Sequence, residues 1–212
     1  MAMSTLSRRA RVARNFGRVV EVVATDILVR EASKPLREPR ARVEVDVIKA
    51  VAGSEDRWRA VVPQARWSRL RAFHARVDVG YLASVDGRFV GEIWLSRVTH
   101  RDPYSGLLIR LADDEAYAYA LWVDPAVRPQ GVAALLMVSM LRDVRDDPAL
   151  TRVYGWVDSR NRESQMLLRL LGFTQVQTVK RLHVLHRFGR PVPRSVKPSF
   201  GPLSRAGRHR AG

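Results

Sequence analysis

Cysteine is absent from the chain. This excludes disulfide bonds, thiolate nucleophiles and metal sites built on cysteine. The serine-hydrolase motif Gly-x-Ser-x-Gly is missing too. We expect no metal centre, because no ligand spacing links the histidines, which are His74, His100, His183, His186 and His209. Any chemistry must come from other side chains or from the backbone.

Long apolar runs are also missing. None approaches the roughly 18 residues that a membrane-spanning helix needs. The arginine-rich N-terminus is followed by no apolar core with a cleavage site, so we identify no secretory signal. With 212 residues, 46% of them apolar and 27% charged, the composition is typical of a soluble globular protein. We therefore expect a cytoplasmic protein without a transmembrane span.

Acidic residues are lacking at both ends. Residues 1–20 contain five arginines and residues 180–212 contain nine lysines or arginines, without an acid in either segment. The other 159 residues carry 23 basic and 21 acidic side chains, so the ends supply most of the net charge of +16. Such basic segments bind polyanions with little sequence preference. A coding bias is the alternative, because 33 arginines stand against 4 lysines.

Composition divides the chain into three parts. Residues 188–212 form a basic tail with the proline, glycine and serine content of a disordered segment. Residues 1–42 form a basic N-terminal extension, in which the apolar run 19–29 predicts an additional strand. That strand either extends a sheet or mediates self-association as a homodimer. The central part, residues 43–187, begins with another predicted strand at 43–50.

The most informative motif, Arg128-Pro129-Gln130-Gly131-Val132-Ala133, lies between a strand and a helix. Residues 116–123 predict a buried strand with Tyr119, Leu121 and Val123 on one face, and Asp124 before Pro125 as its last residue. From Val132, apolar residues at three- and four-residue spacing predict a nearly buried helix. Its first amides carry partial positive charge, and Gly131 admits an anion to the backbone. The motif predicts a pyrophosphate site, unless Gly131 only permits a tight turn.

A second block follows about twenty-five residues later. Residues 152–157 predict a strand and Asn161 lies in a polar loop that caps a helix. Gly172 ends this helix in left-handed geometry, and a further strand is predicted from Val176 to about Leu185. This order of strand, Arg-x-x-Gly-x-Ala loop, helix, strand, Asn-x-x-Ser, helix, Leu-Gly-Phe and strand resembles the GNAT superfamily of acyl-CoA-dependent N-acyltransferases.

The resemblance extends upstream, where residues 80–94 are similar to the family's central hairpin with an Asp86-Gly87 turn. Residues 55–73 are similar to its helical acceptor-side region. The resemblance implies an α/β (α+β) fold with a mixed, mostly antiparallel central sheet flanked by helices. It also implies an N-acetyltransferase that transfers an acetyl group from acetyl-CoA to a primary amine in a ternary complex.

The resemblance assigns the cofactor to both blocks. Backbone amides around the glycine would hold the pyrophosphate, Val123 would bind the pantetheine arm and serve as oxyanion donor, and two polar residues would line the groove. These residues are Val123, Arg128, Gln130, Gly131, Val132, Ala133, Asn161 and Ser164. Pro129 cannot donate and would stiffen the loop. Asn161 is alternatively an ordinary helix cap, and Ser164 a solvated hydroxyl.

One position departs from the family pattern. Many members carry a tyrosine four residues before the Gly-Phe pair, whose hydroxyl protonates the leaving thiolate, and here Leu168 occupies that position. Another group or water must donate the proton, or catalysis relies on positioning. A module that binds coenzyme A or a partner without turnover is therefore one alternative. A nucleic-acid-associated or ribosome-associated protein recruited by its basic tails is another.

Three residues are candidates for the acceptor side. Glu115 and Glu92 are the carboxylates from which a general base is chosen, and Tyr119 would line the acceptor cleft. Glu115 follows two aspartates and alternatively belongs to a solvated turn. Glu92 interrupts an apolar strand, where a charge requires a reason, and alternatively pairs with an arginine. The sequence leaves the acceptor open among a small-molecule amine, an amino sugar, a lysine side chain and a protein N-terminus.

Overall fold

The computed structural model describes residues 20–76, 78–101 and 108–184. Its centre is a seven-stranded sheet in the order β2-β3-β4-β7-β8-β1-β9. All neighbouring strands are antiparallel except β7 and β8, which are parallel. This confirms a mixed, mostly antiparallel sheet flanked by helices. The predictions for the N-terminal arginines up to residue 19 and for the tail 188–212 lie outside the described residues.

The strands of the sheet are β1 (Val20–Glu31), β2 (Asp46–Ala50), β3 (Val79–Val85), β4 (Arg88–Ser96), β7 (Glu115–Val123), β8 (Arg152–Asp158) and β9 (Thr174–Val184). The short strands β5 (His100–Arg101) and β6 (Leu108–Ile109) pair with each other. The helices are α2 (Glu55–Arg59), α3 (Trp67–His74), α4 (Val132–Asp146) and α5 (Arg162–Leu170), with 3-10 turns η1 (Gln64–Arg66) and η2 (Pro125–Gln130). Among the described helices, none is long and apolar enough to cross a bilayer.

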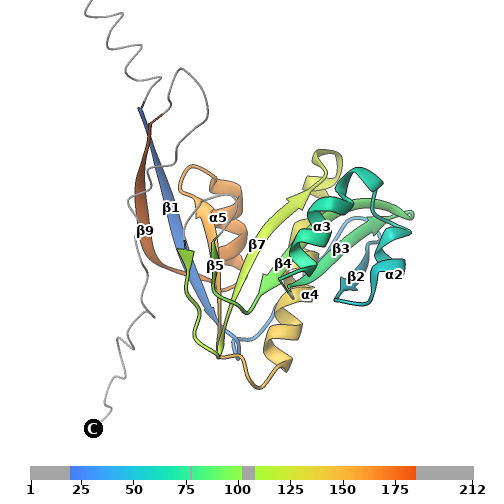
Figure 1. Ribbon diagram of the computed structural model, residues 1–212, viewed down its shortest axis with the longest axis horizontal. Coiled ribbons are helices and arrows are strands. Elements are labelled where there is room, and N and C mark those ends of the chain that lie inside the picture. The colour runs from blue at the N-terminus through green and yellow to red at the C-terminus, as the bar shows by residue number, and fades with distance from the viewer. Residues whose placement is uncertain (1–19, 77, 102–107, 185–212) are drawn as a thin grey trace, which may run out of the picture.

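Two apolar cores lie on opposite faces of the sheet, because alternate strand residues point to opposite sides. The core under α4 and α5 includes Leu136, Met140, Leu141, Val144 and Leu168. The core under α2 and α3 includes Trp58, Leu70, Phe73, Trp94 and Tyr119. In Figure 1 the sheet opens as a V, with β1 and β9 on one arm and β7, β4 and β3 on the other.

The V begins where β7 and β8 stop pairing. Residues 115–118 of β7 pair with residues 152–155 of β8, and no pairing continues beyond them, although both strands do. Ala120 has φ of 57°, a left-handed value that is uncommon for alanine. The register of β7 with β4 shifts at the same place, as in a β-bulge with one extra residue in β7. The bulge lets β7 bend away from β8.

The bulge also corrects one prediction from the sequence. Strict alternation puts Leu121 and Val123 on the same face as Tyr119. In the structure they pack with the α4 core, whereas Trp122 joins Tyr119 in the core under α3. The extra residue at Ala120 reverses the alternation, because side chains of a strand change face at every residue.

The N-terminal strand lies inside the sheet rather than at its edge. β1 pairs along 25–31 with β8 and along 20–29 with β9. Arg30 fixes its end, with a side chain only 1% exposed whose Nε donates to the Leu171 carbonyl at 2.8 Å and whose Nη2 donates to the Lys34 carbonyl at 2.6 Å. The predicted additional strand therefore extends the sheet, and it joins β8 to β9.

Several local predictions are confirmed. The Asp86-Gly87 turn joins β3 to β4 with φ values of 50° and 71°, and Gly172 follows α5 with φ of 86°. Asp124 is the exception, because β7 ends at Val123. Its side chain instead accepts a hydrogen bond from the Ala126 N–H at 3.0 Å and caps η2, so the segment expected as an irregular loop is a 3-10 turn.

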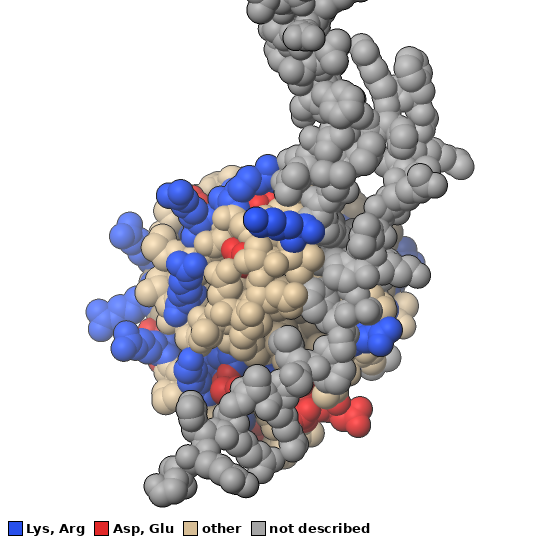
Figure 2. Space-filling model, turned by 90° about the vertical axis from the view of Figure 1, so that its left-hand side faces the viewer, with Lys and Arg blue, Asp and Glu red and all other residues tan. Residues whose placement is uncertain are grey.

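Basic side chains are prominent on one described face. Figure 2 shows lysine and arginine side chains along the left and upper parts of this face, beside an area with few charged residues. Binding of polyanions by the basic ends stays a prediction, because those ends lie outside the described residues.

Candidate active site

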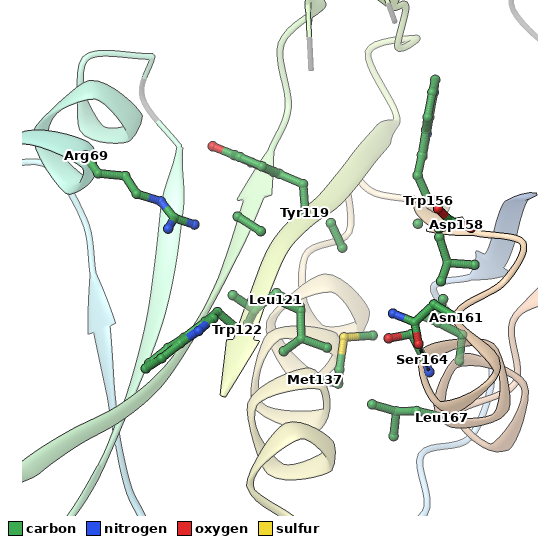
Figure 3. A pocket seen from close by; sticks show the side chains of 16 residues that line it. Arg69, Tyr119, Leu121, Trp122, Met137, Trp156, Asp158, Asn161, Ser164 and Leu167 are labelled. Carbon is green, nitrogen blue, oxygen red and sulfur yellow. Dashed lines mark hydrogen bonds between the residues drawn. The ribbon is translucent and has the colours of Figure 1, made fainter. Parts of the chain in front are cut away.

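A cleft of about 340 Å³ lies where β7 and β8 separate. We call it the β7–β8 cleft; its wall consists of residues 118–122 of β7, residues 155–158 of β8, Asn161 before α5 and parts of α3, α4, α5 and β4 (Figure 3). Met137 and Leu168 border it from the α4 core, and Tyr119 and Trp122 from the core under α3. The cleft therefore connects the two faces of the sheet.

The start of α5 forms one wall of the cleft. Asn161 and Ser164 both line it, and Asn161 Oδ1 accepts a hydrogen bond from the Ser164 N–H at 3.0 Å. Asn161 is thus a helix cap, as one interpretation of the sequence had it, and it also faces the cleft. Leu168 lies deeper on the same wall and is 8% exposed. The position at which the resemblance implies a tyrosine therefore reaches the cleft, but here its surface is apolar.

Gly131, at the start of α4, is not open to an anion as the sequence predicted. Gly131 has φ of 88°, and a Cβ there would lie 3.1 Å from the Arg40 carbonyl oxygen. The Arg42 N–H donates to the Gln130 carbonyl at 2.9 Å. The close approach to Gly131 is thus made by the chain's own segment before β2. The first-turn amides of α4, which include Val132 and Ala133, have no acceptor within the helix.

The end of β7 directs a main-chain donor to the cleft side. The Asp124 N–H donates to the Val90 carbonyl of β4 at 2.8 Å. Because amides along a strand alternate in direction, the N–H of Val123 points away from β4. The Arg128 Nε donates to the Val123 carbonyl at 3.1 Å, so its side chain ties the turn to the strand end.

Glu92 is fully buried and held by basic partners. Its Oε1 is 3.3 Å from Nη1 of Arg66 and 3.4 Å from Nη2 of Arg69, and its Oε2 accepts from the Trp94 indole at 3.1 Å. The alternative that this glutamate pairs with an arginine is what the structure shows. Arg69, rather than Glu92, lines the cleft.

Glu115 is the first residue of β7 and lies where β7 and β8 pair, not where they separate. Its Oε1 accepts from the Tyr154 hydroxyl at 2.8 Å and its Oε2 accepts from the Ala112 N–H at 3.0 Å. The side chain is buried, with 5% of the residue exposed, so the solvated-turn interpretation is wrong. Nη1 of Arg152 lies 3.8 Å from Oε1 as a third partner, and Glu115 does not line the cleft.

Tyr119 does line the cleft, and its hydroxyl belongs to a buried charged cluster. It donates to Oδ2 of Asp78 at 2.6 Å and accepts from Nη2 of Arg76 at 2.5 Å. Nε of Arg76 also donates to Oδ2 of Asp78, at 2.9 Å. Burial, followed by the hydrogen bond to Asp78, raises the pKa of Tyr119 far above its ordinary value. The hydroxyl therefore stays protonated at neutral pH.

Sequence reasoning missed several residues of this site. Asp78 carries a weak signal, an acid directly before an apolar strand. Trp122 and Arg69 carried none, because their positions depend on the bulge and on the packing of α3. The Arg66 guanidinium lies 3.7 Å from the centre of the Trp122 ring, which stacks on Phe89 at 5.8 Å. These contacts hold the α3 side of the cleft in place.

Within the described part of the chain, no three His, Cys, Asp or Glu residues are grouped so as to hold a metal ion. Tyr119, Trp122 and Trp156 give the cleft aromatic walls, and Arg69, Asn161 and Ser164 give it polar side chains. Val123 and the motif residues 128–133 do not line it; their main-chain groups lie at the end of β7, in η2 and at the start of α4. This set suits the binding of an extended, partly anionic molecule along β7 and the start of α4.

Comparisons with known proteins agree with this architecture. The model of the acetyltransferase (GNAT) family matches residues 50–173. Similar solved structures include a Drosophila protein, with a TM-score of 0.52, 16% identity and coverage of 85% of this chain and 57% of that one. A functionally unknown conserved protein from Staphylococcus epidermidis has a TM-score of 0.52 and 14% identity, over 84% of this chain and 66% of that one.

A GCN5-related N-acetyltransferase from Sphaerobacter thermophilus has a TM-score of 0.51 and 17% identity, over 85% of this chain and 56% of that one. At such identities these likenesses show the fold alone, and this chain spans about three fifths of the length of these structures. Among curated proteins, none matches. The family model, however, covers more than half of the chain. The chain belongs to the GNAT acetyltransferase family.

Proposed function

We propose that the protein is an N-acetyltransferase that moves the acetyl group of acetyl-CoA to the primary amine of an acceptor, by direct attack within a ternary complex. The observation that carries the proposal is the β7–β8 cleft, which passes between the two faces of the sheet. A donor held along one face and an acceptor entering from the other would meet inside it. Family membership supplies the cofactor, because GNAT proteins use acetyl-CoA.

The residues at the start of α4 suit this cofactor. The first-turn amides of α4, at Val132 and Ala133, suit the pyrophosphate, because a helix N-terminus attracts anions. Arg128, Gln130 and Gly131 shape the turn that precedes them. Gly131 acts through its left-handed backbone rather than through open access, since the carbonyl of Arg40 occupies its free side.

The pantetheine arm would follow β7 along the part of the strand that no longer pairs with β8. The N–H of Val123 points to this side and is the proposed donor to the thioester oxygen. Asn161 and Ser164 border the opposite wall. Bound acetyl-CoA supplies the thioester, an activated acyl donor, and the protein holds it against the amine.

Leu168 gives the cleft an apolar surface where many relatives place a proton donor. The leucine cannot protonate a thiolate, so this proton comes from water or another group, and the rate relies more on the positioning of the two reactants. Because of this leucine, one alternative stays open, namely a module that binds coenzyme A without turnover.

A thiol-release assay with acetyl-CoA and a panel of amines, combined with calorimetric titration of acetyl-CoA, tests the proposal. We expect binding and amine-dependent thiol release. Binding without thiol release for any amine would favour the non-catalytic module. Absence of binding would contradict the proposal as a whole.

A pair of variants on α5 places the binding in the cleft. Ser164→Trp fills the cleft and should weaken acetyl-CoA binding by about 10-fold or more, since a displaced cofactor loses its contacts along this wall. Met166→Trp adds the same side chain at a position of the same helix that is 61% exposed, and should leave the dissociation constant unchanged. Equal affinities of the two variants would refute the assignment.

A further inference from the structure

We propose that Tyr119 and Asp78 form a proton relay, in which Tyr119 takes a proton from the acceptor amine and passes its own to Asp78. The inference rests on the proposed acetyl transfer and assigns the base that this transfer needs. An amine of ordinary basicity is protonated near neutral pH, so it must lose a proton before or while it attacks a thioester.

Tyr119 is the part of the relay that faces the substrate. It lies directly before the bulge at Ala120, where β7 leaves β8, and it borders the cleft on the α3 side. Figure 3 shows its ring extending from β7 toward the side where Arg69 lies. Its ring packs edge-on against Phe73 at 5.3 Å and stacks on Tyr117 at 5.5 Å, which fixes the position of the hydroxyl.

Asp78 is suited to receive the proton. Its residue is 2% exposed, and Oδ2 accepts hydrogen bonds from Tyr119 and Arg76. Its other oxygen, Oδ1, is buried and has no hydrogen-bond partner among the described residues. Arg76 and Tyr119 thus share one oxygen of the carboxylate, and the other oxygen is available to accept a proton. Packing alone does not explain an aspartate at this position, because its charge is buried and one of its oxygens is unsatisfied.

The proton balance closes without a further reactant. An ammonium N–H bond of the acceptor breaks and its proton binds Oη of Tyr119, while the original Oη–H bond breaks and its proton binds Asp78, so Tyr119 is neutral before and after. The freed amine then forms the N–C bond to the acyl carbon, the C–S bond breaks, and the second amine proton passes through water to the leaving thiolate, which gives the amide and the free thiol. The raised pKa of Tyr119 disfavours a free tyrosinate, so the two transfers occur together. Asp78 returns the proton to water after product release.

The other carboxylates near the cleft are occupied. Both oxygens of Glu92 are bound, by Arg66 and Arg69 on one side and by Trp94 on the other. Asp158 lines the cleft, but Oδ1 accepts from the Arg160 N–H at 2.8 Å and Oδ2 from its guanidinium at 2.9 Å. Among the described carboxylates, Asp78 is thus one that a proton can reach from the cleft through a single hydroxyl, that of Tyr119.

The test compares two tyrosines that each donate to an aspartate. Tyr119→Phe removes the hydroxyl of the relay and keeps the ring. Tyr81→Phe removes a hydroxyl that donates to Oδ2 of Asp143 at 2.7 Å, away from the cleft lining. We expect kcat to fall about 100-fold or more in the first variant, with an unchanged KM for acetyl-CoA. In the second we expect kcat to stay within about twofold of the wild type.

A second readout separates a relay from a structural role. Among the described residues, the charged groups near Tyr119 are Asp78 and Arg76, with Arg69 and its partner Glu92 on the α3 side of the cleft. Arginines keep their charge throughout the accessible pH range. The deficit of Tyr119→Phe should therefore shrink as the pH rises toward the pKa of the amine. It should also shrink with a weakly basic acceptor that is already neutral at pH 7. Asp78→Asn should reproduce both trends while retaining the wild-type KM for acetyl-CoA.

Two results would overturn the relay. One is a Tyr119→Phe variant with wild-type kcat, in an enzyme whose wild type is active. The other is a deficit that is the same at every pH and for every acceptor, which indicates a packing effect. If the wild type releases no thiol with any amine, the proposed function fails and the relay fails with it.

Discussion

Arg30 joins three segments of the chain, and its replacement tests whether β1 is an integral part of the sheet. The guanidinium donates to the carbonyls of Leu171 at 2.8 Å, Lys34 at 2.6 Å and Glu31 at 2.9 Å. Arg30→Met keeps most of the apolar stem and removes these donors. The carbonyl of Leu171 after α5, that of Glu31 at the end of β1 and that of Lys34 beyond it then lose a charged partner.

The size of the effect follows from these bonds. A hydrogen bond from a charged donor contributes about 1.5–3 kcal/mol, but water replaces part of it because these bonds are only partly buried. Recovered desolvation of the arginine offsets a further part. We expect a loss of about 3 kcal/mol in the free energy of unfolding, or about 6–12 °C in Tm for a chain of this size.

Urea denaturation followed by circular dichroism measures the loss. Arg37→Met is the matched control, because Arg37 is exposed in the segment that follows β1. It should change the free energy of unfolding by no more than about 0.5 kcal/mol. A loss below about 1 kcal/mol for Arg30→Met would refute the reasoning, since the carbonyls would then not depend on this side chain.

Two further substitutions test other parts of the site. Glu92→Gln removes the charge between Arg66 and Arg69 and should lower the free energy of unfolding by about 2–3 kcal/mol in urea titrations; the loss is smaller than for a fully buried pair, because the arginines keep 26% and 36% exposure. An unchanged midpoint would contradict this. Gly131→Ala must adopt φ of 88° and approach the Arg40 carbonyl, so Tm should fall by the equivalent of about 1–2 kcal/mol. A variant as stable as the wild type would show that this turn is not strained.

Local elements could be predicted from the sequence, because their signals lie within a few residues. The Asp86-Gly87 turn, the periodic apolar face of α4 and the glycine after α5 each need only their neighbours. The family motifs added the order of these elements and a prediction of where the cofactor binds. Of the residues predicted to bind it, Asn161 and Ser164 line the cleft, whereas Val123 and the residues of the 128–133 motif do not.

The remainder depends on contacts between distant parts of the chain. An alanine with positive φ at position 120 has no local signal, and it reverses the faces of the following residues. The position of β1 between β8 and β9 follows from pairing with strands more than a hundred residues away. The hydrogen bond between Tyr119 and Asp78 spans 41 residues. The contact of Asp78 with Tyr119 and the place of Arg69 in the cleft lining were therefore found only in three dimensions.

Hydrogen exchange of the backbone amides, recorded with and without acetyl-CoA, tests the central claim most directly. If the cofactor binds where the strands separate, protection should rise in the end of β7, in the first turn of α4 and in the start of α5, while β2 and β9 keep their exchange rates. Unchanged exchange in these three segments at saturating acetyl-CoA, or protection confined to other parts of the chain, would contradict the account.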